Sequence, residues 1–409
     1  MGPMKLHFDI RDIFRAPRLA LSGKKIWIFI VGNLVGYVSY WILTYVALAL
    51  AGINFTKAWS DFGLYPCLYG IEAQWFAWIV YLAGVVIWFF AISLSCTAVS
   101  RVTYKQLKGD EFFSSGDAFT FVKKHWHPVI FTSITLLLIV VFFLMGAMIF
   151  ALFGKIPYLG EFLFVIPYLF YFFGAIFTIY TAVVFIIALI YTPAIVAAYE
   201  EDTMGAVFQN YSIAWSQPWR VLLYHLTLLP IGCIGVWIFK YLWLGGFKLI
   251  NYVYGCSWFM GTKLSNIVGW AGDLLNPLFC NAGATICKLG WCGQQAYSSC
   301  LISVPSGTVL SGTEIAAGAI LAIFLSLLAL SVISYGLSIL SVGETIMFVI
   351  FKKKSDDDNL LERKDEDELE ENEEFGTDET PDEEDPEDSN SKEQEDNEGD
   401  SSKEEPNED

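Results

Sequence analysis

The chain has 409 residues, a net charge of −18 and a mean hydropathy of +0.49, and 55% of its residues are apolar. Soluble domains are nearer about 45–50% apolar, so the composition argues against a soluble globular protein. The charge is divided along the chain: residues 355–409 hold 29 acidic and 4 basic side chains, which leaves residues 1–354 with a net charge of +7. We therefore expect a basic, apolar body followed by an acidic tail.

Six apolar runs are long enough to cross a bilayer, which takes about 20 residues per helix. They cover residues 26–52, 75–100, 129–153, 162–191, 221–239 and 315–343. Only helices satisfy their own backbone hydrogen bonds in lipid as single segments. The sequence therefore predicts an all-α polytopic membrane protein with about six transmembrane helices. The first run is too long for the core of a cleavable signal peptide, so we expect it to act as an uncleaved signal anchor.

The segment before the first run, residues 1–25, combines an apolar helical face with basic side chains (Ile10, Ile13 and Phe14 beside Arg11, Arg15 and Arg18). This pattern is typical of a helix that lies on an anionic cytoplasmic leaflet. Within the first run, Gly32 and Gly36 have the spacing that lets two helices approach closely, and we favour packing within the chain over dimerisation. Asn33 lies between them and is a candidate intramembrane polar residue.

A sequence pattern recurs before the third and fifth runs. It reads Gly116, Phe119, Trp126 and Pro128 at the first occurrence, and Gly205, Phe208, Trp215 and Pro218 at the second. The spacing puts the aromatic residues on one helical face, and Ser115 and Thr203 are candidate N-caps. Together with residues 1–25, the pattern predicts three units, each a cytoplasmic amphipathic helix followed by a transmembrane hairpin. The alternative is a chance similarity between two helix starts.

The second occurrence carries a family resemblance. The run YTPAIVAAYEED from Tyr191, followed by GAVF from Gly205 and WSQPWRVL from Trp215, resembles a motif of prokaryotic polytopic membrane proteins. It is also similar to the membrane domain that accompanies some glycerophosphodiester phosphodiesterases. The resemblance covers roughly residues 110–235 and implies a fold without an activity, because the catalytic barrel of those enzymes is a separate soluble domain. The cysteine-rich segment and the acidic tail depart from the family pattern.

Lys and Arg stay on the cytoplasmic side of short loops, which sets the expected orientation. With the N-terminus inside, 15 basic residues fall in cytoplasmic segments and 6 in outside segments. We therefore expect a multi-pass protein of the cell membrane with both termini in the cytoplasm, and Lys352, Lys353 and Lys354 as a membrane anchor. Residues 162–199 carry no charge; we favour one tilted span that ends near Pro193 over two short spans, which would invert everything after them.

Six of the eight cysteines fall in expected outside segments: Cys67, Cys256, Cys280, Cys287, Cys292 and Cys300. An even set on the non-cytoplasmic side favours disulfide bonds in an oxidising compartment, with the pairing open. Zinc binding and free thiols are the alternatives, although the loop has no histidine and no C-x2-C pair. Five of the six lie in residues 248–312, which we expect to form an outward-facing, cysteine-rich loop.

His225 and Glu344 are the other candidate intramembrane polar residues. Ionisable groups inside the membrane mark functional sites by default, although His225 could simply bond a neighbouring helix and Glu344 could be a boundary charge. We find no hydrolase, nucleotide-binding or zinc-protease motif. The sequence therefore predicts no catalytic residue, no cofactor, no metal site and no nucleic-acid partner, and the chain is expected not to be an enzyme.

The expected organisation is a cytoplasmic segment (1–25), five transmembrane helices with amphipathic helices (26–247), the cysteine-rich loop (248–312), a sixth helix with its basic anchor (313–354) and a disordered acidic tail (355–409). Two functions fit. The first is a membrane scaffold or assembly protein, embedded in the lipid bilayer, whose tail recruits a basic cytoplasmic protein. The second is a transporter, channel or lipid-handling component, because repeated hairpins are common in transporters. The sequence leaves the oligomeric state open.

Overall fold

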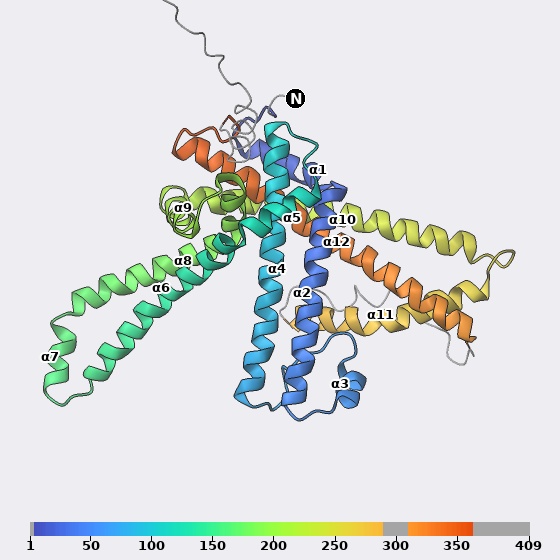
Figure 1. Cartoon of the computed structure of the whole chain (residues 1–409), viewed down its shortest axis with the longest axis horizontal. Coiled ribbons are helices and arrows are strands. Elements are labelled where there is room, and N and C mark those ends of the chain that lie inside the picture. Colours follow the sequence, from blue (N-terminus) through green and yellow to red (C-terminus); the bar gives the residue numbers. More distant parts are fainter. Residues whose placement is uncertain (1–3, 289–309, 363–409) are drawn as a thin grey trace, which may run out of the picture. The chain divides into compact units, whose positions relative to one another are not determined.

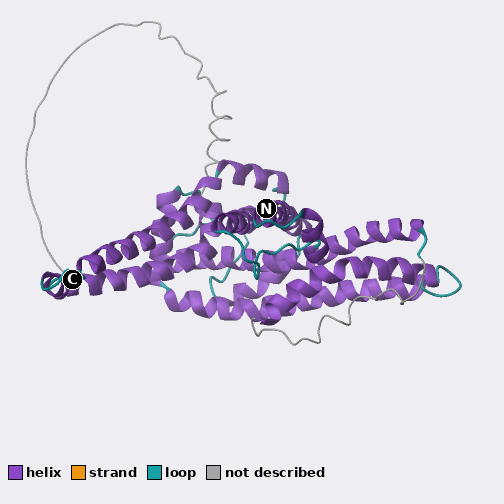
Figure 2. Ribbon diagram, turned by 90° about the horizontal axis from the view of Figure 1, so that it is seen from below, coloured by secondary structure: helices purple, strands orange, loops and turns teal. Residues whose placement is uncertain are grey.

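The computed structural model describes residues 4–288 and 310–362, and it describes no side chains between residues 276 and 288. The described residues form helices joined by loops, with no strand among them (Figures 1 and 2). The elements in chain order are η1 (Ile10–Arg15), α1 (Ala16–Ala20), α2 (Gly23–Leu50), α3 (Phe55–Phe62), α4 (Trp75–Lys108), α5 (Ser115–Lys124), α6 (Trp126–Phe153), α7 (Leu159–Val165), α8 (Tyr168–Tyr199), α9 (Thr203–Ser216), α10 (Pro218–Tyr254), α11 (Thr262–Lys288) and α12 (Gly312–Ser355).

Six of these helices are long and apolar enough to cross a membrane: α2, α4, α6, α8, α10 and α12. Each contains most of one of the six predicted apolar runs, so the prediction of an all-α chain with six candidate membrane-spanning helices is confirmed. Several helices continue past their apolar run. α4 extends to Lys108 and α12 to Ser355. Lys105 and Lys352, near these two ends, are buried against other parts of the chain, whereas Lys354 and Ser355 are exposed.

The uncharged stretch 162–199 contains one candidate span, α8, preceded by the short helix α7. Pro167 is the N-cap residue of α8, whereas Pro193 lies inside the helix, so the expected end near Pro193 is wrong. A proline removes one backbone hydrogen bond, but neighbouring helices stabilise such positions in membrane proteins. Here the residues that follow Pro193, from Ala194 to Ala198, are buried in the main core, which holds the last turns helical.

α2 and α4 pack along each other, as Figure 1 shows for the two blue helices. A Cβ atom added to Gly32 would lie 1.8 Å from Ser95 Oγ, and one added to Gly36 would lie 2.3 Å from Trp88 Cδ1. Both glycines of the G-x3-G pattern therefore lie in the contact with α4. Their missing side chains let the two helix backbones approach closely, which is how small residues act at membrane helix interfaces.

The segment between α2 and α4, which includes α3, folds back on the far ends of these two helices. Tyrosine hydroxyls of α2 donate to carbonyl groups of this segment: Tyr40 to Pro66 at 2.7 Å and Tyr45 to Gly63 at 2.6 Å. Ala58 of α3 and Leu68 of the loop complete a small apolar core there. The α2–α4 pair thus carries an ordered cap at the end opposite to Lys108.

The main core lies where the N-terminal segment meets the C-terminal turns of α4, α8 and α12 and the first turns of α10. Its members include Ile13, Tyr104, Ile195 and Phe348, all fully buried, and Tyr224, which is nearly so. Elsewhere the spans expose large apolar side chains, as α6 does with Phe142 (71% exposed) and α8 with Phe170 (82% exposed). Exposed apolar helix surfaces of this kind suit contact with lipid tails.

Residues 248–312 were expected to form a loop, but part of this segment is helical. α10 continues to Tyr254, and α11 occupies residues 262–288 and packs against α12 through Ala271, Leu275 and Ala322. This helix is not evident in the sequence, because its apolar residues are interrupted by Gly, Asn and Asp.

The expected disulfide bonds are not supported where cysteine side chains are described. Cys67 and Cys256 carry free thiols, as do Cys96 and Cys233. The Cys67 sulfur lies 3.8 Å from the Tyr81 hydroxyl and accepts a hydrogen bond from the Tyr69 amide. Cys292 and Cys300, and the side chains of Cys280 and Cys287, lie outside the described part of the chain.

Candidate functional site

Polar side chains concentrate where α4, α8 and α12 contact one another, near the C-terminal ends of all three helices. The hydroxyls of Ser100 in α4 and Ser341 in α12 lie 3.2 Å apart, and Ser341 also donates to the Cys96 carbonyl at 3.0 Å. In lipid such groups must find partners inside the protein, so these contacts tie α4 to α12. This junction is the candidate functional site, because polar side chains from three helices and a buried ion pair meet there.

Arg101 and Glu200 form a buried ion pair at the junction, with Arg101 Nη1 2.7 Å from Glu200 Oε1. Glu200 ends α8 in the left-handed conformation (φ 57°), which turns the chain back toward α4. Arg101 also donates to the Ala197 carbonyl at 3.0 Å, and its guanidinium lies 4.3 Å from the centre of the Phe121 ring. A cation at a helix C-terminus interacts favourably with the helix dipole, so Arg101 caps α8 in addition to neutralising Glu200.

Sequence reasoning missed this pair because it counted Arg101 among the cytoplasmic loop charges. Two signals point to it: Arg101 directly follows an apolar run without a helix breaker, and YTPAIVAAYEED ends in acidic residues after a run of small ones. Lys25 was counted in the same way and is also buried. Its ammonium group donates to the Leu19 carbonyl at 3.0 Å and to Gln106 Oε1 at 2.9 Å, which fastens the start of α2 to α4.

Two of the three candidate intramembrane residues lie beside Tyr191 of α8. The Tyr191 hydroxyl lies 3.4 Å from His225 Nδ1 and donates a hydrogen bond to Met347 Sδ at 3.2 Å. Met347 lies one helical turn after Glu344 in α12. Glu344 is half-buried, lies within electrostatic range of Tyr191 and Cys96, and has no hydrogen-bond or ion-pair partner among the described residues. We call Glu344, Tyr191, His225 and Cys96 the inner polar cluster.

Asn33, the third candidate, is satisfied within its own helix. Its side-chain amide donates to the Phe29 carbonyl at 2.9 Å, one turn earlier in α2, and the residue is nearly fully buried. Asn33 therefore contributes to α2 itself, and the structure gives it no contact with the inner polar cluster.

The three lysines at the end of α12 pair with carboxylates. Lys352 lies 2.5 Å from Asp356, Lys353 lies 2.9 Å from Asp357, and Lys354 lies 2.8 Å from Asp9 of the N-terminal segment. The hydrogen bond from Lys354 holds the pKa of Asp9 below its ordinary value, and that from Lys352 does the same for the pKa of Asp356. Both carboxylates are therefore stabilised in their ionised form.

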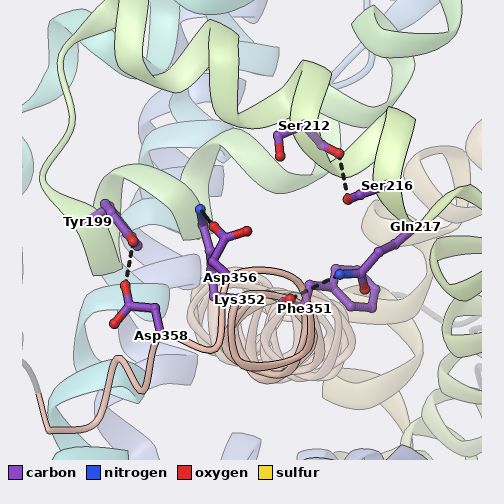
Figure 3. A network of polar contacts seen from close by, with 8 residues as sticks. All are labelled: Tyr199, Ser212, Ser216, Gln217, Phe351, Lys352, Asp356 and Asp358. Atoms are coloured by element: carbon purple, nitrogen blue, oxygen red, sulfur yellow. Dashed lines mark hydrogen bonds and ion pairs between the residues drawn. The ribbon is translucent and has the colours of Figure 1, made fainter.

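Beyond α12 the chain packs back onto the junction, as Figure 3 shows for part of this contact. Tyr199 at the end of α8 donates to Asp358 Oδ2 at 2.6 Å, and Tyr104 of α4 donates to the Leu360 carbonyl at 2.8 Å. The side chains of Leu360 and Leu361 are buried in the main core. We call residues 356–362 the tail root, because the acidic residues of the tail follow it in the sequence.

Gln217, at the start of α10, supports the same end of α12. Its amide nitrogen donates to the Phe351 carbonyl at 3.0 Å, and Ser216 of α9 bonds the Ser212 carbonyl of its own helix nearby (Figure 3). Carbonyl groups at a helix C-terminus lack partners within the helix, so a side-chain amide stabilises them. The end of α12 is therefore held by α10 as well as by the tail root.

The helices α5 and α9 begin at the two residues expected as N-caps, Ser115 and Thr203, and each is capped by the residue before it. Ser114 rather than Ser115 caps α5, in a reciprocal arrangement with Asp117, and the hydrogen bonds from Ser114 lower the pKa of Asp117. Asp202 rather than Thr203 caps α9 and accepts from the Gly205 amide at 2.7 Å. Serine and aspartate are both good N-caps. Ser114 and Asp202 each lie three residues before the backbone amide that they accept from, that of Asp117 and that of Gly205.

Within the described residues, no group of three His, Cys, Asp or Glu side chains is placed to hold a metal ion. The arrangement of charges at the junction is suited to holding segments together: Arg101 joins α4 to the end of α8, and Lys354 joins α12 to the N-terminal segment. Comparisons with protein-family models, with curated proteins and with solved structures find no match to this chain.

Proposed function

We propose that this chain is a non-enzymatic membrane scaffold, whose helical body fixes the starting point of an acidic docking arm. The observation that carries the proposal is the tail root. Its carboxylates, one backbone carbonyl and two leucine side chains all contact the helix ends, from α4, α8 and α12. An arm that only kept the protein soluble would need no such fixed attachment.

The partner of the arm is a basic cytoplasmic protein. Residues 363–409 continue the acidic composition of the root, and a dense negative charge steers basic partners over distances of about a Debye length. The Lys354–Asp9 contact supports placing the N-terminal segment and the end of α12 on one side of the membrane. The excess of basic residues in the same segments makes that side the cytoplasm.

The hydroxyl groups of the spans favour a scaffold over a transporter. Many of them bond the carbonyl one turn earlier in their own helix, as Thr44 does with Tyr40, Ser93 with Phe89 and Thr178 with Gly174. A hydroxyl used in this way is less available to a passing solute. A path across the membrane would need polar groups that face one another near the middle of the spans.

The three-unit architecture is part of the proposal. Contacts between α2 and α4, between α6 and α8, and between α10 and α12 support three hairpins, although α11 also packs on α12. α5 and α9 precede the second and third of these pairs. Phe208 and Trp215 of α9 are 70% and 80% exposed, while the opposite side of α9 is buried. Exposed aromatic residues of this kind suit the membrane interface.

The test is a crosslinked pull-down from native membranes with three forms of the protein. These are the full chain, a chain that ends at Lys354 and a chain that ends at Glu362, which keeps the tail root. We expect basic proteins to be captured only by the full chain, and the capture to weaken at high salt because the attraction is between exposed charges. Identical captures from all three forms would overturn the proposal.

A point variant separates the root from the arm. Tyr199→Phe keeps every tail charge and removes the hydrogen bond to Asp358, so a scaffold that depends on a fixed root should capture its partner less efficiently. Tyr252→Phe is the matched control, since Tyr252 lies in α10 and is 83% exposed. If both variants capture as well as the natural chain, the root has no part in docking.

A further inference from the structure

We propose that Glu344 is a proton-binding carboxyl group in the membrane-embedded part of the chain, and that its protonation state controls the packing of α4, α8 and α12. The ligand is a proton from water, and the step is the reversible conversion of the carboxylate into the neutral acid. This inference does not depend on the docking arm, because Glu344 lies inside α12 and the arm follows residue 362.

Glu344 lacks a counter-charge within the described part of the chain. It is half-buried at the helix junction and has no hydrogen bond or ion pair among the described residues. By contrast, Arg101 and Glu200 lie in the same junction and neutralise each other. Moving an unpaired carboxylate out of water costs several kcal/mol, whereas the protonated acid is an ordinary polar group. The surroundings of Glu344 therefore favour the neutral form.

Groups from several elements surround Glu344. Cys96 of α4 and Tyr191 of α8 lie within electrostatic range of it, and His225 of α10 lies 3.4 Å from the Tyr191 hydroxyl. From α2, Lys25 already donates to Leu19 and Gln106. From the N-terminal segment, Asp12 and Arg15 lie 3.7 Å apart and face each other. No described Lys, Arg or His forms an ion pair with Glu344 or lies within electrostatic range of it.

Neighbouring neutral groups can exchange hydrogen bonds with the acid. His225 Nδ1 donates to the Val221 carbonyl at 2.9 Å, which leaves Nε2 as a buried acceptor without a partner. The Tyr191 hydroxyl donates to the Met347 sulfur, a weak acceptor. When Glu344 ionises, its carboxylate becomes a much stronger acceptor than a thioether. Ionisation should therefore draw the Tyr191 hydroxyl away from Met347 and disturb the contact between α8 and α12.

A proton fits the cluster better than a metal ion does. Na⁺ and divalent ions need several oxygen ligands around them, and no group of three carboxylate, thiol or imidazole side chains is gathered for a metal in the described residues. Glu344 offers one carboxylate, beside a thiol and a phenol.

The test is infrared spectroscopy of the full chain in lipid vesicles, with Glu344→Gln compared with the natural protein. At neutral pH an exposed carboxyl group is ionised, because Asp and Glu ordinarily titrate near about pH 4. We expect a C=O band of a protonated acid at neutral pH, lost in Glu344→Gln and converted into carboxylate absorption as the pH rises. Glu314→Gln is the control, because Glu314 lies in the same helix and accepts from the Ser311 amide at 2.8 Å.

Thermal unfolding adds a readout of helix packing. We expect the unfolding temperature of the natural chain to fall more steeply than that of Glu344→Gln as the pH rises from neutral. If Glu344→Gln does not fold, Glu344→Asp should keep the acid band at a shifted frequency. Absence of an acid band at neutral pH, or the same band in Glu344→Gln, would overturn the proposal, as would a band that disappears on adding Na⁺ at constant pH. Failure here would leave the pull-down result unaffected.

Discussion

Arg101 of α4 and Glu200 at the end of α8 form a buried ion pair with 2.7 Å between Nη1 and Oε1, and the same guanidinium bonds the Ala197 carbonyl. One side chain therefore neutralises the acid that ends α8 and stabilises the helix end itself. The pair joins the first half of the membrane body to the second, since α4 and α8 are separated by α5, α6 and α7.

Arg101→Gln should be strongly destabilising. It removes the charge that balances Glu200 and leaves a buried carboxylate, for which losses of about 3–5 kcal/mol are typical. Unfolding in mixed micelles, followed by circular dichroism, measures the change. Arg220→Gln is the matched control, because within the described part of the chain Arg220 makes a 3.2 Å hydrogen bond to Gln217 and a ring contact with Trp219 but no ion pair. Equal losses in the two variants would contradict the structural role of the ion pair.

Gly32→Ala should also be destabilising, by about 1–3 kcal/mol, because overpacking a close helix contact forces side chains or backbones apart. The new Cβ would lie 1.8 Å from Ser95 Oγ. Ser95→Ala in the same chain should recover part of the loss. Gly146→Ala in α6 is the control, since a Cβ there meets nothing within 4 Å and alanine is the better helix former. The same unfolding assay applies, and a Gly32→Ala chain as stable as Gly146→Ala would contradict the α2–α4 packing.

Acid should release the tail root. The pKa of Asp356 and the pKa of Asp9 are both lowered by lysines of α12, so these carboxylates contribute stability above the ordinary aspartate pKa of about 3.9. That contribution is lost as the pH falls through the lowered folded-state pKa values. Hydrogen exchange of residues 356–362, corrected for the intrinsic rate at each pH, should become faster below that range. Asp356→Asn should show the faster exchange at neutral pH, and a protected root in that variant would contradict the role of the pair.

Cys256 should react with a thiol reagent without prior reduction. Its thiol is free and exposed in the loop that follows α10. A chain that keeps Cys256 as its single cysteine, treated on intact cells with a reagent that does not cross membranes, tests both the thiol and the orientation. Labelling from outside is expected if the termini are cytoplasmic. A single-cysteine chain with Cys96, which lies at the helix junction, serves as the unlabelled control, and labelling of Cys256 only after permeabilisation would reverse the expected orientation.

Hydropathy was sufficient to predict the six candidate spans. The free energy of transferring about 20 apolar residues into lipid outweighs the secondary-structure propensities of the individual residues. It could not predict where the helices end. Lys108 and Ser355 lie beyond the apolar runs, and the buried Lys105 and Lys352 indicate that tertiary packing supports the turns leading to those ends. α11 was missed for a related reason, since its helical state is supported by contact with α12.

The charges of the site were harder to predict than the spans. Lys25 and Arg101 look like ordinary cytoplasmic charges in the sequence, and only their three-dimensional partners, Gln106 and Glu200, make burial favourable. The tail root had a local signal: Leu360 and Leu361 form the only adjacent apolar pair in residues 355–409. The acidic composition of residues 355–409 suggested that the chain leaves the helical body directly after Lys354. The burial of Leu360 and Leu361 shows that it remains in contact with the body as far as these two residues.

The attachment of the tail root has a mechanical consequence. A pull exerted on the chain at Glu362 would first load Leu360 and Asp358, which are bonded to Tyr104 and Tyr199. Tension would therefore be shared by α4 and α8 before it reached α12, and by the N-terminal segment through Asp9 and Lys354. A cargo tethered to the arm would strain several helices in parallel, so the anchorage should yield in stages rather than by extraction of one helix.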